Sequence, residues 1–592
     1  MVFTLSGFRR LPKAVLARVA LAAGGAIFAT VLLLQLWRSV LPSFGPAQYS
    51  YSGPPDRSAP LPLDVPSEGS LLRVRTTMKV GTIHPSVLSI TPDDCLEALT
   101  VNEHRVVAPH SICLDNPGAL YVGDLLAAGD NALEFVIKDQ GGRGGVHIGV
   151  SITDPLFLTL IGLSAALVSI SWILACRWLG HSTTGWVLLA IAIVALAVRL
   201  PLILSPGYLF DIRLNAHWAK SAAILGVGSS YTHQIGEPRL PNYPPLQLAI
   251  FAAAGRVYNL VISPSFDTGL ADCVAFMKLP AIAADVVIAI LTYLFVRKWR
   301  SPESAIVAAL IYAMQPGIWY ESAVWGQVDS IFALAALTSL IAACTRRWTV
   351  MGAFAALALL TKLQAMVILP TLGLVCILEP RAIRPAAIGS VLGIIPGVAL
   401  VHTSDAFAAL KDVYLHSAGF FPVLSMYAYN VWIALFGLAA RDRPDTDLLF
   451  GLTSYRNVGS ILFAIFALLL PVLGARKIRR AGGDSTRTEI IFWIPALTTY
   501  SFFLFNTEMH ERYVFLLIPL GLIATVLSRR GTWPYVVASV LFFMNMLGAL
   551  PWKALDRALF KELPNLPAVI GVCNVGAFAA MLAGLVRARR RA

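Results

Sequence analysis

Long apolar runs separated by short polar links make up most of this sequence, and they restrict the fold more than any other feature. A helix needs roughly 20 consecutive apolar residues to cross the hydrocarbon core of a bilayer. Of the 592 residues, 57% are hydrophobic and only 13% are charged, against about 25% charged residues in soluble globular proteins. The sequence therefore predicts a polytopic α-helical membrane protein.

The apolar runs predict about 14 transmembrane helices, and the first follows a basic N-terminus and lacks a clear signal-peptide cleavage site. We expect helices at residues 15–36, 155–177, 183–204, 276–297, 303–320, 325–345, 349–362, 365–379, 384–401, 456–475, 488–506, 513–528, 533–550 and 564–587. The runs at 349–362 and 365–379 are short, which favours half-helices or tilted elements. Residues 246–262 and 428–439 are typical of helices at the membrane interface.

Residues 45–152 form the one long polar region of the chain. Apolar and polar residues alternate there with a period of two, for example at 72–78 and 133–137, and turn clusters separate the alternating stretches. This pattern predicts a β-sandwich or jelly-roll domain. Cys95 and Cys113 lie within it and predict a disulfide if the domain is extracytoplasmic.

We therefore expect three units: a cytoplasmic N-terminus with the first transmembrane helix (1–44), the β-domain (45–152) and a multi-helix membrane domain (153–592). Lysine and arginine gather in links on one side of the helix count, at 297–300, 346–347, 476–480, 529–530 and 587–591. The positive-inside rule makes that side cytoplasmic and places the β-domain outside. The net charge of +13 comes largely with these links rather than with one continuous basic face, so a nucleic-acid partner is not expected.

The links on the opposite side hold the acidic, histidine and aromatic residues. The candidate site residues there are Asp211, Arg213, His217, Trp218, Tyr243, Glu321, Trp325, Gln327, Asp329, Lys362, Gln364, His510, Glu511, Arg512 and Tyr513, and His402, Asp405 and His416 are further polar residues of this face. Charged residues at a membrane face are usually functional or paired. An alternative stays open in which Glu321 and Asp329 pair with Lys362 or Arg512 and only hold helices together.

Two kinds of chemistry find little support in the sequence. There is no glycine-rich phosphate loop and no Asp-x-Asp in a soluble domain, which disfavours a cytoplasmic enzyme that uses a nucleotide sugar. The cysteines and histidines show no metal-type spacing, and no motif requires a cofactor. A divalent metal shared by Asp211, Glu321 and Asp329 is still compatible with the sequence.

Five short motifs, in this order along the chain, resemble bacterial GT-C glycosyltransferases. They are residues 242–245 (Asn-Tyr-Pro-Pro), 278–285 (Lys-Leu-Pro-Ala-Ile-Ala-Ala-Asp), 325–330 (Trp-Gly-Gln-Val-Asp-Ser), 362–364 (Lys-Leu-Gln) and 509–513 (Met-His-Glu-Arg-Tyr). The resemblance extends over about residues 155–550. It is strongest to mannosyltransferases related to the enzyme that adds the second mannose of GPI anchors, and more distant to the dolichyl-phosphate-sugar transferases of the N-glycan pathway.

This resemblance implies transfer of a monosaccharide from a polyprenyl-phosphate donor to a hydroxyl acceptor, with inversion, on the extracytoplasmic face. Asp211 is then the base that removes the acceptor proton, and Glu321 and Asp329 orient it or its partners. Lys362, His510 and Arg512 stabilise the leaving phosphate. The residues then expected to contact substrate are Arg213, His217, Trp218, Tyr243, Trp325, Gln327, Gln364, Glu511 and Tyr513.

Three functional interpretations remain at this stage. The first is the transferase, with a glycan, glycolipid or protein acceptor, in a bacterial inner (plasma) membrane and with its site facing the periplasm. The second is a transporter or flippase of lipid-linked sugars, although no convincing internal repeat supports it. The third is a non-catalytic scaffold that displays the β-domain. Residues 91–103 and 129–137 resemble galactose-binding-like jelly-roll modules, which implies either recognition of a sugar or a purely structural lid.

Overall fold

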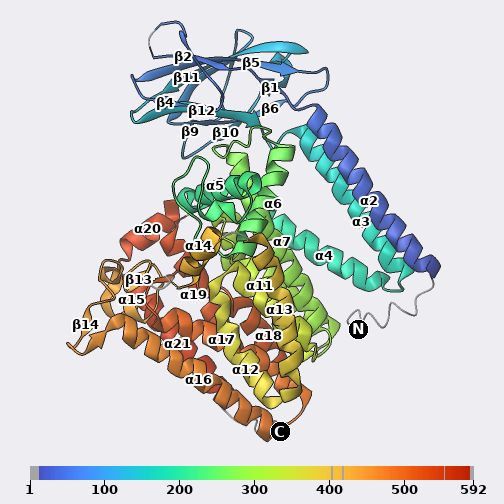
Figure 1. Ribbon diagram of the computed structural model, residues 1–592, viewed down its shortest axis with the longest axis vertical. Helices are drawn as coiled ribbons and strands as arrows, with labels where there is room; N and C mark the ends of the chain where they lie inside the picture. Colours follow the sequence, from blue (N-terminus) through green and yellow to red (C-terminus); the bar gives the residue numbers. More distant parts are fainter. Residues whose placement is uncertain (1–12, 52, 402–403, 416–418, 552–553, 587–592) are drawn as a thin grey trace.

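The computed structural model describes residues 13–51, 53–401, 404–415, 419–551 and 554–586. His402 and His416, named above as polar residues of the outer face, lie outside the described residues. The chain forms a β-domain at one end of a large helical bundle, and a pair of helices connects the two along one side (Figure 1).

The β-domain consists of two antiparallel sheets built from short strands. The larger sheet has the strand order β3-β2-β5-β11-β7-β8, and the smaller has the order β10-β6-β12-β4. The strands are β1 (Ser43–Phe44), β2 (Ala47–Ser50), β3 (Arg57–Ala59), β4 (Leu63–Pro66), β5 (Leu71–Val80), β6 (Val87–Pro92), β7 (Cys95–Val101), β8 (His104–Val106), β9 (Ile112–Cys113), β10 (Gly118–Tyr121), β11 (Gly129–Lys138) and β12 (Arg143–Val150).

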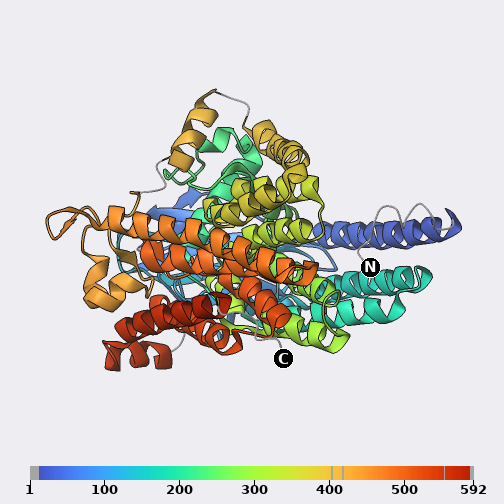
Figure 2. The same ribbon diagram turned by 90° about the horizontal axis from the view of Figure 1, so that it is seen from below.

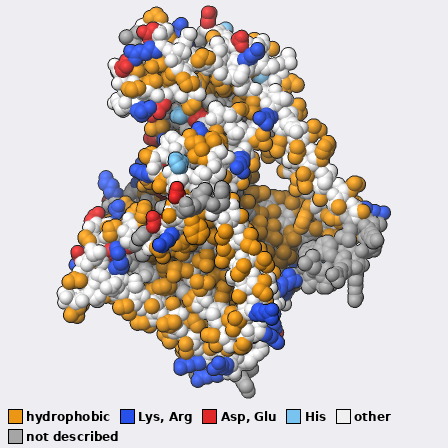
Figure 3. All heavy atoms as spheres, viewed as in Figure 1, with side chains coloured by type: hydrophobic (Ala, Val, Ile, Leu, Met, Phe, Trp, Pro, Cys, Tyr) orange, Lys and Arg blue, Asp and Glu red, His pale blue; other side chains and the backbone are white. Residues whose placement is uncertain are grey.

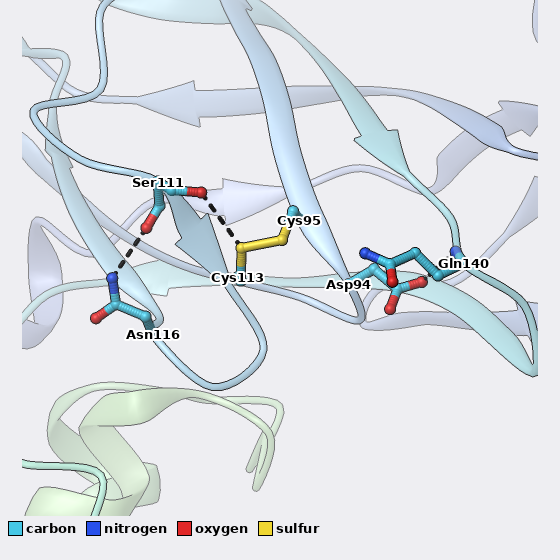
Figure 4. Close-up of a disulfide and its surroundings, with 6 residues drawn as sticks. All are labelled: Asp94, Cys95, Ser111, Cys113, Asn116 and Gln140. Atoms are coloured by element: carbon cyan, nitrogen blue, oxygen red, sulfur yellow. Dashed lines mark hydrogen bonds between the residues drawn. A yellow bond between two sulfur atoms is a disulfide. The ribbon is translucent and has the colours of Figure 1, made fainter. Parts of the chain in front are cut away.

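The alternation seen in the sequence decides which side chains of these strands are buried. Along β5 every second residue, from Leu72 to Val80, is buried, and the residues between them face outward. β5 pairs with β11 over its whole length, and both contribute to one hydrophobic core shared with the smaller sheet. A disulfide joins Cys95 at the start of β7 to Cys113 at the end of β9 (Figure 4).

Helices account for most of the remaining chain. They are α2 (Lys13–Ser39), α3 (Pro155–Trp178), α4 (Ser182–Arg199), α5 (Leu209–Leu225), α6 (Pro245–Val261), α7 (Ala271–Val296), α8 (Pro302–Met314), α9 (Pro316–Trp319), α10 (Asp329–Cys344), α11 (Trp348–Thr361), α12 (Leu369–Leu378), α13 (Ile383–Leu400), α14 (Ser404–Leu415), α15 (Val431–Phe436), α16 (Tyr455–Ala481), α17 (Asp484–Phe505), α18 (Leu517–Ser528), α19 (Thr532–Ala549), α20 (Ala554–Glu562) and α21 (Leu566–Val586). Four short strands, β13 (Ser425–Met426), β14 (Leu448–Leu449), β15 (Thr453–Ser454) and β16 (Met509–His510), lie in the links.

Each stretch expected to be a transmembrane helix contains a helix, but not all of these helices are long. In the described part of the chain, nine helices are long and apolar enough to cross a membrane, and six further apolar helices are shorter. α18, for example, has 12 residues and therefore spans only about 18 Å at 1.5 Å per residue. The shorter helices, such as α10 and α18, lie largely inside the bundle, where other helices rather than lipid surround them.

Helices α2 and α3 lie side by side and lead away from the β-domain, and α4 returns the chain to the bundle (Figures 1 and 2). The β-domain contacts the membrane domain through polar groups in the segment before α7 and in the first turn of α7. His147 of β12 contacts Asp267 at 2.7 Å, and the Asp272 carboxylate accepts a hydrogen bond from the backbone of Ile152 at 2.7 Å. These contacts hold the β-domain against the end of the bundle that also carries α5.

The surface of the bundle is predominantly apolar along its length, and lysine and arginine side chains gather at the end farthest from the β-domain (Figure 3). The long helix α16 ends there with Arg479 and Arg480 in its last turn. The two ends of the bundle therefore differ chemically, in the way that the distribution of charged links in the sequence indicates.

The segment 208–245 lies in a link between two expected transmembrane helices, 183–204 and 276–297, and its first half is the helix α5. Ile212, Ala216 and Ala219 recur at helical spacing and are buried, so α5 has an apolar face that packs on α6 and α7. Asp211 lies in the first turn, where a carboxylate is favoured by the positive end of the helix dipole.

Candidate active site

The N-terminus of α5 is built against the backbone of residues 324–325. Gly207 has φ +66°, and a Cβ there would collide with the carbonyl oxygen of Trp325, so this approach requires glycine. Tyr208 follows, and its ring lies edge-on to the Trp325 ring with centroids 6.4 Å apart. This contact places Asp211 next to the segment 320–330, although more than a hundred residues separate them in the sequence.

Gln327 makes the direct link to Asp211. Its side-chain amide donates to Asp211 Oδ2 at 2.7 Å, and only 1% of the Gln327 surface is exposed. The Asp211 carboxylate is half-buried, so one of its oxygens is fixed by an amide while the residue remains partly accessible. This hydrogen bond is the central feature of the candidate site.

The segment 320–330 reverses direction over a short distance. Residues Tyr320–Trp325 form a π-helical turn, and the backbone amides of Gly326 and Gln327 both donate to the carbonyl of Glu321 at 3.0 Å. α10 then starts at Asp329, whose backbone amide donates to Glu321 Oε1 at 3.2 Å. The turn therefore brings the carboxylates of Glu321 and Asp329 together, and Glu321 is completely buried.

Asp329 also belongs to a buried cluster of charges. It forms an ion pair with Lys362, which follows the end of α11, and its other oxygen lies 3.7 Å from Arg512 Nε. Arg512 in turn contacts Glu511 Oε1 at 2.5 Å. The pairing of Asp329 with Lys362, left open in the sequence, is therefore present. It does not exclude a catalytic role, because the same cluster lies beside Asp211 and Gln327.

A small parallel strand pair holds the segment 506–513 in place. β16 pairs with β13, and Tyr427 bridges to His510. Glu508, at φ +60°, accepts hydrogen bonds from the backbone amides of Gly419 and Phe421. Arg456, which contacts Glu508 at 3.3 Å, also forms a bidentate pair with Asp445 at 2.9 Å.

Sequence reasoning missed these supporting groups. Asp445, Arg456 and Glu508 come from separate links, and no local pattern connects a carboxylate to an arginine or to a distant backbone amide. Glu508 alone carried a signal, since it immediately precedes the 509–513 motif.

The charge state of the 509–513 segment follows from its burial. Burial lowers the pKa of His510, so this side chain is neutral at pH 7 and acts as a hydrogen-bonding group rather than a cation. Burial raises the pKa of Glu511, but opposing influences, of which the positive charge of Arg512 is the largest, together lower it by more and hold it at about 2. Of the three groups expected to stabilise a phosphate, Lys362 and Arg512 therefore supply the positive charge.

Several buried polar atoms around Arg512 have no hydrogen-bond partner among the described residues. They are Arg512 Nε, Trp325 Nε1, Asp329 Oδ2 and Glu321 Oε2. The Arg512 guanidinium carbon lies 6.0 Å from the centre of the Trp325 ring, so the two side chains are neighbours. A buried polar atom without a partner costs about 1–3 kcal/mol, which favours a bound polar ligand or water at this place.

The predicted aromatic residues divide between the cluster and the protein interior. Tyr513 lies beside both Lys362 and Arg512, with 5.5 Å between Lys362 Nζ and the ring centre. Tyr243 lies close enough to Arg512, Asp329 and Asp211 for the charges of these three side chains to act on its hydroxyl group. Trp218 is buried, and its indole donates to the carbonyl of Arg239 at 2.8 Å, so it fixes the loop before α6.

Arg213 and His217 do not converge on Asp211. Arg213 lines a small pocket with Thr91 and Pro117 of the β-domain, and His217 lies beside Gly236. The reason is that α5 is a helix: with 3.6 residues per turn, a residue two positions from Asp211 points about 200° away from it. Gln364 lies two residues beyond Lys362 in a 3₁₀ turn and is half-buried.

The carboxylates Asp211, Glu321 and Asp329 do not form a shared metal site. In the part of the chain that the structure describes, no group of three or more His, Cys, Asp or Glu side chains could hold a metal ion. Asp211 instead accepts a hydrogen bond from Gln327, and Asp329 pairs with Lys362.

No protein-family model matches this sequence, and no curated protein matches it. Among solved structures, it is similar to ArnT from Cupriavidus metallidurans bound to undecaprenyl phosphate, with 13% identity, a TM-score of 0.37 and coverage of 70% of this chain and 77% of that one. An oligosaccharyltransferase of Archaeoglobus fulgidus gives 12% identity and a TM-score of 0.35 (67% and 56% covered), and the arabinosyltransferase EmbB of Mycobacterium smegmatis gives 13% and 0.29 (98% and 64% covered). At these values the likeness assigns neither a family nor a function to this chain.

Proposed function

We propose that this protein is a membrane glycosyltransferase of the GT-C type, which transfers a monosaccharide from a polyprenyl-phosphate donor to a hydroxyl acceptor with inversion. The observation that carries the proposal is the position of Asp211. Its carboxylate is half-buried, is fixed by Gln327, and lies beside a buried cluster that contains Lys362 and Arg512. A base next to fixed positive charge is what such a transfer needs.

Asp211 serves as the base. A hydroxyl acceptor must lose its proton as it attacks the anomeric carbon, and a carboxylate fixed at hydrogen-bond distance can accept that proton. The amide of Gln327 holds one oxygen of Asp211 at 2.7 Å, which limits the orientations of the carboxylate. The new bond forms at the anomeric carbon as its bond to the phosphate oxygen breaks, and the phosphate leaves as an anion.

Arg512 and Lys362 stabilise that anion. Arg512 Nε and Trp325 Nε1 are buried donors without a hydrogen-bond partner among the described residues, and the oxygens of a phosphate could accept from them. The carboxylates of Asp329 and Glu511 keep these cations in position before the donor binds. The phosphate would then contact Lys362 and Arg512 while these two cations stay paired with Asp329 and Glu511.

An apolar cavity of about 380 Å³ suits the lipid part of such a donor. Helices α11, α13 and α14 form its walls, with Pro245 at the start of α6, and its lining is almost free of polar surface. Leu359 and Leu360 in this wall immediately precede Thr361 and Lys362. Ile394, Val398 and Phe407 are exposed on the side where lipid would lie. A polyprenyl chain in this cavity would place its phosphate near Lys362.

The orientation follows from the two ends of the bundle. Lysine and arginine gather at one end, which the positive-inside rule assigns to the cytoplasm. The β-domain with its Cys95–Cys113 disulfide lies at the other end, beside α5, whose first turn contains Asp211. A disulfide persists in an oxidising compartment. These features support a reaction on the extracytoplasmic face, and the resemblance of the sequence motifs to bacterial transferases supports a bacterial inner membrane.

The test uses purified protein in detergent and radiolabelled polyprenyl-phosphate mannose, glucose, galactose and arabinose. Mannose is offered first, because the sequence motifs resemble mannosyltransferases. Wild type is compared with Asp211→Asn and with the control Glu303→Gln, which removes an exposed carboxylate from the first turn of α8. We expect wild type and the control to consume one donor, and Asp211→Asn to bind that donor without consuming it.

Two results would contradict the proposal. A fully active Asp211→Asn enzyme would show that Asp211 is not the base. If wild type engages no donor, the transferase assignment is wrong. Movement of a lipid-linked sugar across liposomes without formation of a glycosidic bond would then identify a transporter.

A further inference from the structure

A completely buried ion pair lies next to the candidate active site and has no role in the chemistry proposed above. Arg199 at the end of α4 donates from Nε to Asp285 Oδ2 on α7 at 2.8 Å, and both side chains are 0% exposed. The Arg199 guanidinium also donates to the carbonyls of Ala195 and Ala313 at 3.0 and 2.9 Å. Burial of a charge pair between membrane helices is costly unless hydrogen bonds satisfy both charged groups.

Three hydroxyl groups complete the hydrogen bonding of Asp285. Ser322 donates to Oδ2 at 2.7 Å, Ser330 donates to Oδ1 at 2.5 Å, and Tyr312 of α8 donates to Oδ1 at 3.0 Å. All three hydroxyl-bearing residues are 0% exposed. Asp285 thus accepts four hydrogen bonds from side chains of four separate elements.

Two of these donors flank the functional residues of the segment 320–330. Ser322 directly follows Glu321, and Ser330 directly follows Asp329. One carboxylate therefore holds both ends of the turn that carries Glu321, Gln327 and Asp329. Gln327 fixes Asp211 by a hydrogen bond. A shift of Asp285 would therefore move this turn and, through Gln327, the proposed base.

The same face of α7 holds the segment that leads into α5. Lys278 lies seven residues, or two turns, before Asp285 and donates from Nζ to the carbonyls of Ile203 and Ser205 at 3.1 and 2.5 Å. Its side chain passes beside Gly326, where a Cβ would come within 3.2 Å of Lys278 Cε. α7 therefore contacts both segments that meet at the Asp211–Gln327 hydrogen bond.

We propose that Asp285, charged and paired with Arg199, is a positioning residue that fixes the Glu321–Asp329 turn relative to Asp211 through the hydroxyls of Ser322 and Ser330. This inference rests on the transferase function proposed above. The competing interpretation is that the ion pair only stabilises the packing of α4, α7 and α8. The two interpretations differ in what removal of the serine hydroxyls does to catalysis in folded enzyme.

The experiment compares Ser322→Ala, Ser330→Ala and the double variant with wild type and with Ser339→Ala. Ser339 is a matched control, because it is a buried serine of α10 whose hydroxyl donates to the carbonyl of Met351, away from the site. The measurements are kcat, the KM for the polyprenyl-phosphate sugar that wild type consumes, binding of that donor, and the thermal unfolding temperature.

We expect each single serine variant to lower kcat about 10- to 100-fold, because small displacements of catalytic groups have effects of that size. The donor KM should change less than kcat, since Arg512 stays paired with Glu511 and the apolar cavity is unchanged. Ser339→Ala should lose some thermal stability and keep wild-type kcat. Ser330→Thr keeps the hydroxyl and should retain a higher kcat than Ser330→Ala.

Three outcomes would overturn the inference. If the serine variants lower the unfolding temperature but keep wild-type kcat, Asp285 is structural only. If the serine variants and the control Ser339→Ala lower kcat and raise KM to the same extent, loss of any buried serine hydroxyl disturbs the enzyme and Asp285 has no specific positioning role. If wild type consumes no donor at all, the proposed function fails and this inference with it, an outcome distinct from the other two. Asp285→Asn is not needed for these conclusions, because it leaves Arg199 buried without a counter-charge and endangers folding.

Discussion

The side-chain amide of Gln327 donates a hydrogen bond to the carboxylate of Asp211 at 2.7 Å, and this contact joins two segments of the membrane domain that are far apart in the sequence. If Asp211 is the base, this hydrogen bond sets its orientation. We expect Gln327→Ala to lower kcat about 10- to 100-fold with little change in donor KM. Steady-state kinetics on purified protein measures both values.

Gln48→Ala is the control for this prediction, because Gln48 is an exposed glutamine of β2 far from the site. A Gln327→Ala enzyme with wild-type kcat would show that the hydrogen bond to Asp211 does not contribute to catalysis.

The ion pair between Lys362 and Asp329 is buried, and a double-mutant cycle can separate its contribution to stability from its contribution to activity. Lys362→Met leaves the Asp329 carboxylate without its main partner, and we expect a loss of about 3–5 kcal/mol in the free energy of unfolding. Lys362→Met with Asp329→Leu should be more stable than either single variant but remain inactive. Unfolding in detergent followed by tryptophan fluorescence provides the measurement, and strictly additive losses would argue against the pair.

The apolar cavity between α11, α13 and α14 predicts a dependence on the length of the donor lipid. Ile394→Trp enlarges a side chain that lines the cavity and is 45% exposed, so the larger ring can occupy the space without disturbing the protein interior. We expect it to raise the KM for a long-chain donor about tenfold and to leave the KM for a short-chain analogue unchanged. Equal effects on both donors would indicate that the lipid does not enter this cavity.

The Cys95–Cys113 disulfide ties β7 to β9 in the β-domain. Replacing both cysteines with serine releases a loop of 18 residues, which should cost about 3 kcal/mol of stability in the chain-entropy description. Limited proteolysis should then cut within residues 95–125, while the helical bundle stays intact. Unchanged protease resistance would show that strand pairing alone stabilises this part of the domain.

His510 predicts a pH dependence of stability. Because burial lowers its pKa in the folded protein, the unfolded chain binds more protons near and below its own pKa of about 6.5. Stability should therefore be fully present above pH 6.5 and fall as the pH drops below it. His510→Gln should reduce this acid sensitivity, measured as unfolding temperature between pH 5 and pH 8. An identical pH dependence in wild type and variant would contradict the prediction.

Much of the fold could be predicted from the sequence because its patterns are local. Runs such as 276–297 and 488–506 predict α7 and α17, since a helix that meets lipid or other helices must be apolar over its length. The period-two pattern at 72–78 predicts β5 because alternate residues of a strand face the core. No helix was expected at α5, because its buried face mixes small alanines with the polar residues Asn215 and Ser221, which weakens the apolar pattern.

By itself, the sequence predicted which segments form apolar helices, that residues 45–152 contain strands, and that acidic and aromatic residues gather in the links opposite the basic ones. The tertiary structure alone decided which of those residues meet. Gln327 reaches Asp211, Lys362 reaches Asp329, and Asp285 collects Arg199, Ser322 and Ser330 from three other elements. The physical reason is that hydrophobic periodicity is repeated over many neighbouring residues, whereas a polar contact between distant segments depends on the packing of several helices and leaves no repeated pattern in the chain.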